Sequence, residues 1–136
     1  MAFVIKAEVG DPAAAGFVFN RHKTMYAGKN IAEGDLIFLF ASENQGGGGL
    51  VAAGIVTSVK ALAKKPGSAR QTPRASITVR STGLAKRSLG RAELKRFSNW
   101  NDPTAETELN FKLYRQATNK IVGISDAAAE FLIGYF

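Results

Sequence analysis

The side chains in this chain that could do chemistry are cations, amides and aromatic rings in polar segments. There is no cysteine, which excludes disulfides, thiol nucleophiles and cysteine-bound zinc or iron–sulfur centres. His22 is the single histidine, so a histidine-rich metal site is excluded too. We therefore expect neither a metal nor a cofactor.

One short segment supplies a candidate catalytic pair. Lys23 and Thr24 stand side by side in a polar stretch. A buried lysine can act as a base, and a threonine next to it is a potential nucleophile. The alternative is an exposed loop with no reactive role, and we favour a binding function over an enzymatic one.

Four consecutive glycines at 46–49 invite comparison with a phosphate-binding loop. Such a loop continues into Lys and Ser or Thr, whereas Leu50 and Val51 follow here. The glycines therefore predict the tip of a hairpin. No glycine fingerprint for dinucleotides follows a predicted strand.

Two aromatic residues, Tyr26 and Trp100, stand in polar segments. Aromatic faces stack on nucleobases, and with a basic surface they indicate recognition of single-stranded or flipped bases. The other interpretation is that both rings cover the core. Arg115-Gln116 and Asn119-Lys120 could likewise contact a base edge or cap the sheet.

Positive charge is concentrated between residues 60 and 96. This segment has eleven Lys and Arg against one acid, Glu93, for a net charge of +10. The rest of the chain has seven basic and ten acidic residues, a net charge of −3. A cationic segment on a slightly acidic chain predicts a polyanionic partner, most commonly nucleic acid. A solvated basic loop that only aids solubility is the alternative.

Length and hydropathy bound the architecture. The 136 residues are 46% hydrophobic, which predicts a single globular domain over 1–136. No apolar run approaches the roughly 20 residues of a membrane span, and the N-terminus lacks a signal-like core. We expect no membrane association and a cytoplasmic location.

Apolar alternation and continuous apolar runs predict five strands, at 3–9, 36–41, 50–59, 75–80 and 121–124. The second and third should pair as a hairpin, with a bend or bulge at Gly54. A chain that consists mostly of strands, with a few short helices, favours a small curled sheet or barrel.

Two helices are predicted, one over 89–97 capped by Ser88 and one that follows Ser125 as its cap. Other segments are less regular. The structure of segment 13–19 is ambiguous, because only part of it favours a helix, and segment 108–116 could be helix or strand. Loops are expected at 20–30 and 60–74.

Four blocks in this order resemble the EVE family of the PUA-like superfamily: Gly34–Ser42, Val51–Val59, Arg80–Phe97 and Leu113–Leu132. The resemblance implies a mainly β, α+β fold, a PUA-like pseudobarrel of five or six strands with short peripheral helices. It also implies a pocket for an everted base, in family members often a modified cytosine. The expected function is a nucleic-acid-binding module, with DNA and RNA both open.

The resemblance also suggests site residues. Family members line the pocket with an aromatic residue and a Gly-x-Arg-Asn stretch, and Tyr26–Asn30 occupies that place with Lys29 where Arg is usual. The N-terminal strand lacks the family's Trp. The expected pocket comprises Tyr26, Lys29, Asn30, Phe40, Ser42, Trp100 and Gln116. The expected phosphate contacts are Arg70, Arg74, Arg80 and Arg87.

The related ASCH domains compete for the same segment. His22-Lys23-Thr24 ahead of Gly34-Asp35 resembles their Lys-Thr motif before a Gly-Asp turn. Some of those proteins are amidohydrolases of acylated cytidine, in which Lys activates Thr or water and a Glu assists. No motif identifies the assisting Glu in this sequence. By elimination, the candidates are Glu33, Glu43 and Glu93. A protein–protein interaction domain is the third possibility.

Overall fold

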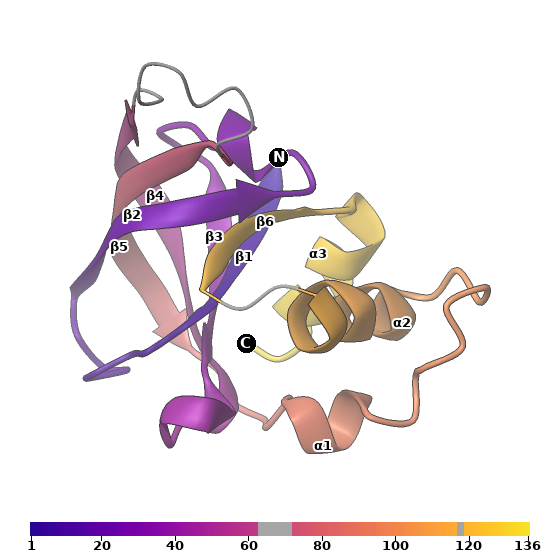
Figure 1. Ribbon diagram of the computed structural model, residues 1–136. Coiled ribbons are helices and arrows are strands. Elements are labelled where there is room, and N and C mark those ends of the chain that lie inside the picture. Colours follow the sequence, from indigo (N-terminus) through magenta and orange to yellow (C-terminus); the bar gives the residue numbers. More distant parts are fainter. Residues whose placement is uncertain (63–71, 117–118) are drawn as a thin grey trace.

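Six strands form a closed barrel in the computed structural model, which describes residues 1–62, 72–116 and 119–136 (Figure 1). The order around the barrel is β1-β3-β4-β5-β2-β6. The strands are β1 (Ala2–Ala7), β2 (Gly16–Met25), β3 (Leu36–Ala41), β4 (Gly49–Leu62), β5 (Arg74–Leu84) and β6 (Lys120–Ile124). The predicted closure of a curled sheet is confirmed.

The strand pairing is mixed. β1 runs parallel to β3, and β2 runs parallel to β6, while all other neighbours are antiparallel. The predicted hairpin of β3 and β4 is confirmed, and the register against β5 shifts between Ala53 and Gly54. A Cβ at Gly54 would lie 2.6 Å from the carbonyl oxygen of Arg80, so the close approach of β5 requires glycine here.

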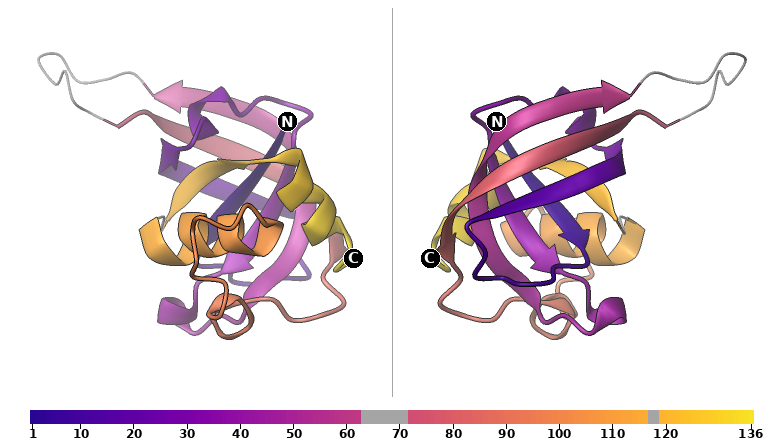
Figure 2. Two further views of the ribbon diagram at one scale, coloured as in Figure 1. Left: turned by 90° about the vertical axis from the view of Figure 1, so that its right-hand side faces the viewer. Right: turned by 90° about the vertical axis from the view of Figure 1, so that its left-hand side faces the viewer.

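The three α-helices gather on one side of the barrel (Figures 1 and 2). They are α1 (Arg91–Leu94), α2 (Ala105–Leu109) and α3 (Asp126–Ile133). Two 3₁₀ turns, η1 (Gly28–Asn30) and η2 (Glu43–Gln45), and a π-helix, η3 (Asn110–Gln116), complete the described elements. The predicted cap of α3 is confirmed, because the Ser125 hydroxyl oxygen accepts the Ala128 N–H at 3.1 Å.

Two sequence-based expectations need correction, and one open alternative is resolved. The expected loop at 20–30 is largely strand β2, whose alternation is broken by a register shift between Phe19 and His22. The helix expected from 89 begins at Arg91, and Gly90 rather than Ser88 is its N-cap. Segment 108–116 is helical, because α2 continues directly into η3.

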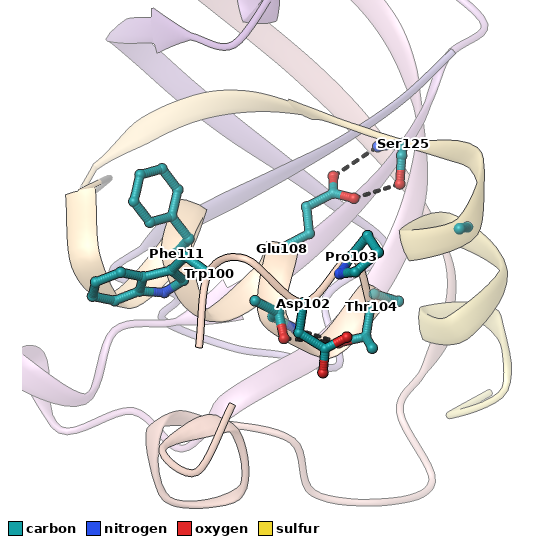
Figure 3. Close-up of a pocket in the computed structure, with 10 residues that line it drawn as sticks. Trp100, Asp102, Pro103, Thr104, Glu108, Phe111 and Ser125 are labelled. Carbon is teal, nitrogen blue, oxygen red and sulfur yellow. Dashed lines mark hydrogen bonds between the residues drawn. The ribbon is translucent and has the colours of Figure 1, made fainter. Parts of the chain in front are cut away.

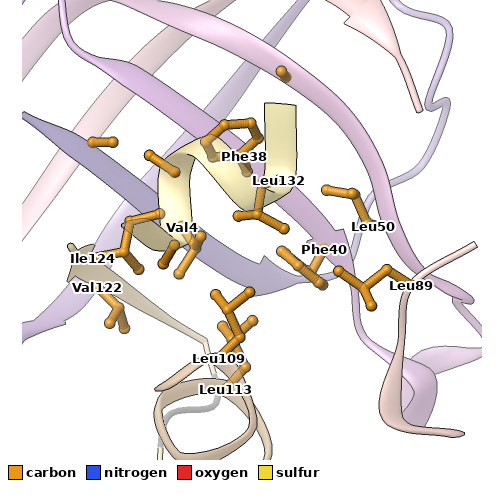
Figure 4. Close-up of a cluster of buried hydrophobic side chains, with 14 of the residues drawn as sticks. Val4, Phe38, Phe40, Leu50, Leu89, Leu109, Leu113, Val122, Ile124 and Leu132 are labelled. Carbon is orange, nitrogen blue, oxygen red and sulfur yellow. The ribbon is translucent and has the colours of Figure 1, made fainter. Parts of the chain in front are cut away.

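Two apolar cores occupy opposite faces of the strands. The interior core fills the barrel with residues such as Phe3, Ile37 and Ile77. The outer core lies between the barrel and the helices and includes Phe38, Leu109 and Leu132 (Figure 4). Side chains alternate between the two faces of a strand, so those of β1 and β3 enter the two cores in turn. Both strands are therefore buried on both faces. This explains their nearly continuous apolar sequences.

Leu109→Ala should destabilise the protein by about 2–5 kcal/mol, since it opens a cavity in the outer core where Leu109 is fully buried. Chemical denaturation monitored by circular dichroism would measure the change. Leu84→Ala is the matched control, because Leu84 is 49% exposed and should change stability by less than about 0.5 kcal/mol. Equal losses for both variants would contradict the assignment of the outer core.

Candidate functional site

A buried lysine stands at the end of β1. Lys6 is the one charged residue of that strand, yet its side chain is only 2% exposed. It shares the outer face of β1 with Val4 and points toward η3 rather than into the barrel. Its Nζ lies 4.4 Å from the centroid of the Tyr114 ring. A lysine in such a place is rare without a functional or pairing role.

A carboxylate follows the end of the neighbouring strand. β1 and β3 are parallel and end at the same level, with Ala7 opposite Ala41. The Ser42 N–H continues this pairing by donating to the Ala7 carbonyl at 2.9 Å. Glu43 opens the turn that comes next, and its contacts with Tyr114 of η3 and Arg91 of α1 place its carboxylate on the helix side, near Lys6.

Only one of the two Glu43 carboxylate oxygens is satisfied. Oε1 accepts the Tyr114 hydroxyl at 2.9 Å and the Arg91 backbone N–H at 3.2 Å. Oε2 is buried without a hydrogen-bond partner among the residues that the structure describes. A buried carboxylate oxygen with no donor costs stability, so this atom marks a place where a ligand group could donate. We call Lys6, Ser42, Glu43, Arg91 and Tyr114 the Lys6–Glu43 cluster.

The electrostatics of the cluster are perturbed. Burial lowers the pKa of Lys6, and the nearby Arg91 lowers it further, although the Glu43 carboxylate acts in the opposite direction. Burial, followed by the hydrogen bond to Glu43, raises the pKa of Tyr114 well above its usual range. Tyr114 therefore stays a hydroxyl donor at neutral pH. The cluster can offer both a hydrogen-bond acceptor and cationic donors to one ligand.

The two aromatic residues singled out from the sequence do come together. Tyr26 and Trp100 flank Phe111, with ring centroids 6.4 and 5.5 Å from it. The Lys112 ammonium lies 5.0 Å from the Tyr26 ring centre, and the Arg115 guanidinium lies 5.4 Å from that of Trp100. Trp100 remains 46% exposed, which leaves apolar aromatic surface open to solvent.

A pocket of about 470 Å³ lies beside Trp100 and Phe111 (Figure 3). Glu108 on its wall accepts hydrogen bonds from the Ser125 N–H at 2.9 Å and from the Ser125 hydroxyl. It also forms an ion pair with Lys112 at 3.0 Å. Burial raises the pKa of Glu108, but these donors outweigh burial and lower it overall. The carboxylate thus braces the start of α3.

The remaining expected pocket residues are dispersed. Phe40 is fully buried in the outer core and has no face open to a base, which corrects its expected role as a pocket wall. Ser42 is buried next to Glu43, while Lys29 and Asn30 are exposed on η1. Gln116 ends η3, and its side chain lies outside what the structure describes.

The expected phosphate contacts also differ in environment. Arg74 and Arg80 both lie on β5, and Arg74 donates to the Arg21 carbonyl at 2.8 Å. Arg87 donates to the Gly134 carbonyl at 2.8 Å and stacks 4.3 Å from the Tyr135 ring centre, so it tethers the end of α3. Arg70 lies outside the described residues.

The candidate catalytic pair is not brought together. Lys23 and Thr24 are consecutive on β2 and point to opposite faces of the barrel wall. Thr24 is buried, and its hydroxyl donates to the Pro73 carbonyl at 2.9 Å, whereas Lys23 is exposed. The geometry expected for a lysine that activates this threonine is therefore absent.

Sequence reasoning missed Lys6, Arg91 and Tyr114 as site residues, and it named Glu43 only by elimination. One signal was available, a single lysine inside the apolar run of the first strand. No sequence pattern indicates that Tyr114 and Arg91 approach it. Among the described residues, no group of acids and histidines is placed to hold a metal ion. In the same part of the chain, no helix has the length and hydropathy needed to cross a membrane.

Replacing Lys6 by Met should alter how stability depends on pH. Between the lowered pKa of native Lys6 and 10.5, the unfolded chain binds more protons than the native protein. The free energy of unfolding of the wild type should therefore rise relative to Lys6→Met as pH increases toward 10.5. Urea denaturation of both proteins at several pH values would measure this. A constant difference would contradict a perturbed Lys6.

Glu108→Gln should also change how stability depends on pH, but in the acid range. The pKa of Glu108 is lower in the native state than the 4.5 of a free side chain, so its stabilisation is complete above that value and is lost as pH falls through the native pKa. The wild type should exceed the variant in stability near pH 7, with the gap closing in acid. If the difference in stability between the two proteins is unchanged at pH 3, the ionised Glu108 carboxylate does not stabilise the start of α3.

Comparisons with known proteins bear on the fold. No protein-family model matches the chain, and no curated protein matches its sequence. A crystal structure of human THYN1 protein in complex with 5-methylcytosine containing DNA is similar, with a TM-score of 0.66 and 15% identity over 98% of this chain and 95% of that one.

Two further solved structures agree. The DUF55 domain of human thymocyte nuclear protein 1 has a TM-score of 0.64 and 15% identity, covering 98% of this chain and 97% of the domain. An NMR structure from Rhodopseudomonas palustris has a TM-score of 0.55 and 13% identity, covering 98% and 91%. The chain thus has the fold of the DUF55 domain, and the PUA-like pseudobarrel expected from the EVE resemblance is confirmed.

Proposed function

We propose that this protein is a nucleic-acid-binding domain that holds one unpaired base at the Lys6–Glu43 cluster. The observation that carries the proposal is the buried Glu43 Oε2, which has no donor among the described residues. A ligand that donates a hydrogen bond to this oxygen would remove the cost of leaving it unpaired. The required ligand group is therefore an N–H or O–H donor.

A cytosine edge fits the polarity of the cluster. Cytosine carries an exocyclic amino group next to ring and carbonyl acceptors, and a carboxylate is a common acceptor for that amino group. The Lys6 ammonium has three donors, and its described contact is the face of the Tyr114 ring rather than a hydrogen-bond acceptor. Glu43 and Lys6 would thus read a donor and an acceptor on the same base edge.

The similarity in fold to human THYN1 protein, solved with 5-methylcytosine containing DNA, supports this choice of ligand. Flipped bases are read by hydrogen bonds at their edge and are stacked between aromatic or apolar side chains. Tyr26 and Trp100 are candidates for such stacking from their position beside Phe111. Arg74 and Arg80, two cations of the basic segment that lie on β5, would contribute salt-dependent affinity through phosphates.

Glu43→Gln tests the base site, because it keeps the side chain's shape but replaces a carboxylate oxygen with an amide donor. Oligonucleotides that differ only in one unpaired base, cytosine, 5-methylcytosine or uracil, would be titrated by fluorescence anisotropy at fixed salt. We expect the wild type to prefer both cytosines. The variant should lose roughly 10- to 100-fold of this preference, since one specific base contact contributes about 1–3 kcal/mol.

Glu130→Gln is the matched control, because it makes the same charge change at an exposed position on α3. It should retain the preference for cytosine. If the Glu43 variant discriminates between bases as well as the wild type does, the base is not read at this cluster. If the wild type binds none of the oligonucleotides, the proposed function itself is wrong.

A further inference from the structure

One face of the barrel has cations and no acids. The four adjacent strands β4, β5, β2 and β6 contain no Asp or Glu at all. They carry six Lys and Arg residues: Arg21, Lys23, Lys60, Arg74, Arg80 and Lys120. Half of these cations, those of β2 and β6, lie outside the basic segment noticed in the sequence, and the barrel brings them beside it.

Three of these cations form a row across neighbouring strands. Lys23 on β2 is directly opposite Arg74 on β5, and it is also directly opposite Lys120 on β6. Directly opposed residues project on the same side, and the next residues, Thr24 and Ile121, are buried, so the row faces outward. Like charges in this arrangement repel each other and destabilise the sheet.

The row ends at a polar pocket beside the end of β1 and the start of β5. This pocket has a volume of about 410 Å³ and is lined by Arg21, His22, Arg74 and Asn119, with Glu8 as its one acid. Arginine has five N–H donors, so the single bond from Arg74 to the Arg21 carbonyl leaves it able to bind a phosphate. The excess of positive charge favours an anion.

The backbone of this pocket is held in an unusual conformation. Arg21 and Asn119 both have positive φ angles, 56° and 54°, which cost energy in residues other than glycine. Arg21 is clamped from both sides, since its N–H donates to the Ser76 hydroxyl oxygen at 2.9 Å and its carbonyl accepts from Arg74 at 2.8 Å. The His22 Nδ1 donates to the Asn119 carbonyl at 3.1 Å. The fold thus fixes the backbone at Arg21 and the side chains of Arg74 and His22.

The pocket adjoins the strand end that carries the base site. The Asn119 N–H donates to the carbonyl of Lys6 at 2.9 Å, and Ala7 and Glu8 line the pocket. The Lys6 side chain leaves β1 on the helix side, while the pocket lies on the other side of the same strand end. A nucleic-acid strand could therefore contact both sites.

We propose that the row Arg74–Lys23–Lys120 is a second nucleic-acid contact, which binds the phosphate backbone, and that the Arg21–His22–Arg74 pocket holds one of its phosphates. This inference rests on the proposed function but concerns a different surface from the base site. Phosphate contacts set affinity and orientation without reading sequence. The repulsion within the row would be relieved on binding.

Lys23→Gln and Lys120→Gln, singly and together, test the row. Affinity for a single-stranded oligonucleotide would be measured by fluorescence anisotropy across a range of salt concentrations. Each lost phosphate contact should reduce the slope of log affinity against log salt by about 0.7. The free variants should also melt at a higher temperature than the wild type, because repulsion is removed. Weaker binding with higher thermal stability cannot be explained by unfolding.

Lys86→Gln is the matched control, because Lys86 follows the far end of the strand that Arg74 begins. It should leave the slope unchanged. Arg21→Gly tests the pocket, since glycine accepts the positive φ angle while the guanidinium is lost. It should weaken binding of the same oligonucleotide and lower its salt slope in the same way.

Unchanged slopes in the Lys23, Lys120 and Arg21 variants would overturn the inference while leaving the base site intact, provided that the wild type still prefers cytosine. A slope reduced equally by Lys86→Gln would also overturn it, because the effect would then reflect net charge alone. A wild type that binds no oligonucleotide would end both this inference and the proposed function.

Discussion

The burial of β1 on both faces is the constraint on which the rest of this structure depends. Its inward side chains fill the barrel, and its outward side chains support the helices. A strand in that position has no solvated face, so any polar residue on it must find partners inside the protein. Lys6 is that residue, and the turn after β3, together with η3 and the start of α1, surrounds it with Glu43, Tyr114 and Arg91.

The same packing explains why the candidate base site is not fully satisfied. Glu43 Oε1 is held by two donors, whereas Oε2 is buried and has none among the described residues. Buried polar atoms without partners are uncommon in folded proteins, and a functional role is one of the established explanations for them. The contrast with Glu108 is informative, because that carboxylate is saturated by Ser125 and Lys112 and acts as a structural brace.

Charge is arranged around the molecule by the barrel rather than by the sequence order. Four adjacent strands are free of acids, while α2 and α3 carry Glu106, Glu108, Asp126 and Glu130. A polyanion would thus be attracted to the strands that carry cations and no acids. This asymmetry orients a nucleic acid without specifying a base, and the near-neutral base site would supply the choice.

The sequence alone determined the barrel class, the β3–β4 hairpin, the bulge at Gly54 and the Ser125 cap, since each depends on local alternation, glycine or capping chemistry. It also indicated the basic segment. Only the tertiary structure decided that β2 is a strand, that Phe40 is core, and that Lys23 and Lys120 join Arg74 in one row. Those facts depend on which strands become neighbours when the barrel closes. Strand pairing brings together residues about 50 to 100 positions apart, and no local pattern records it.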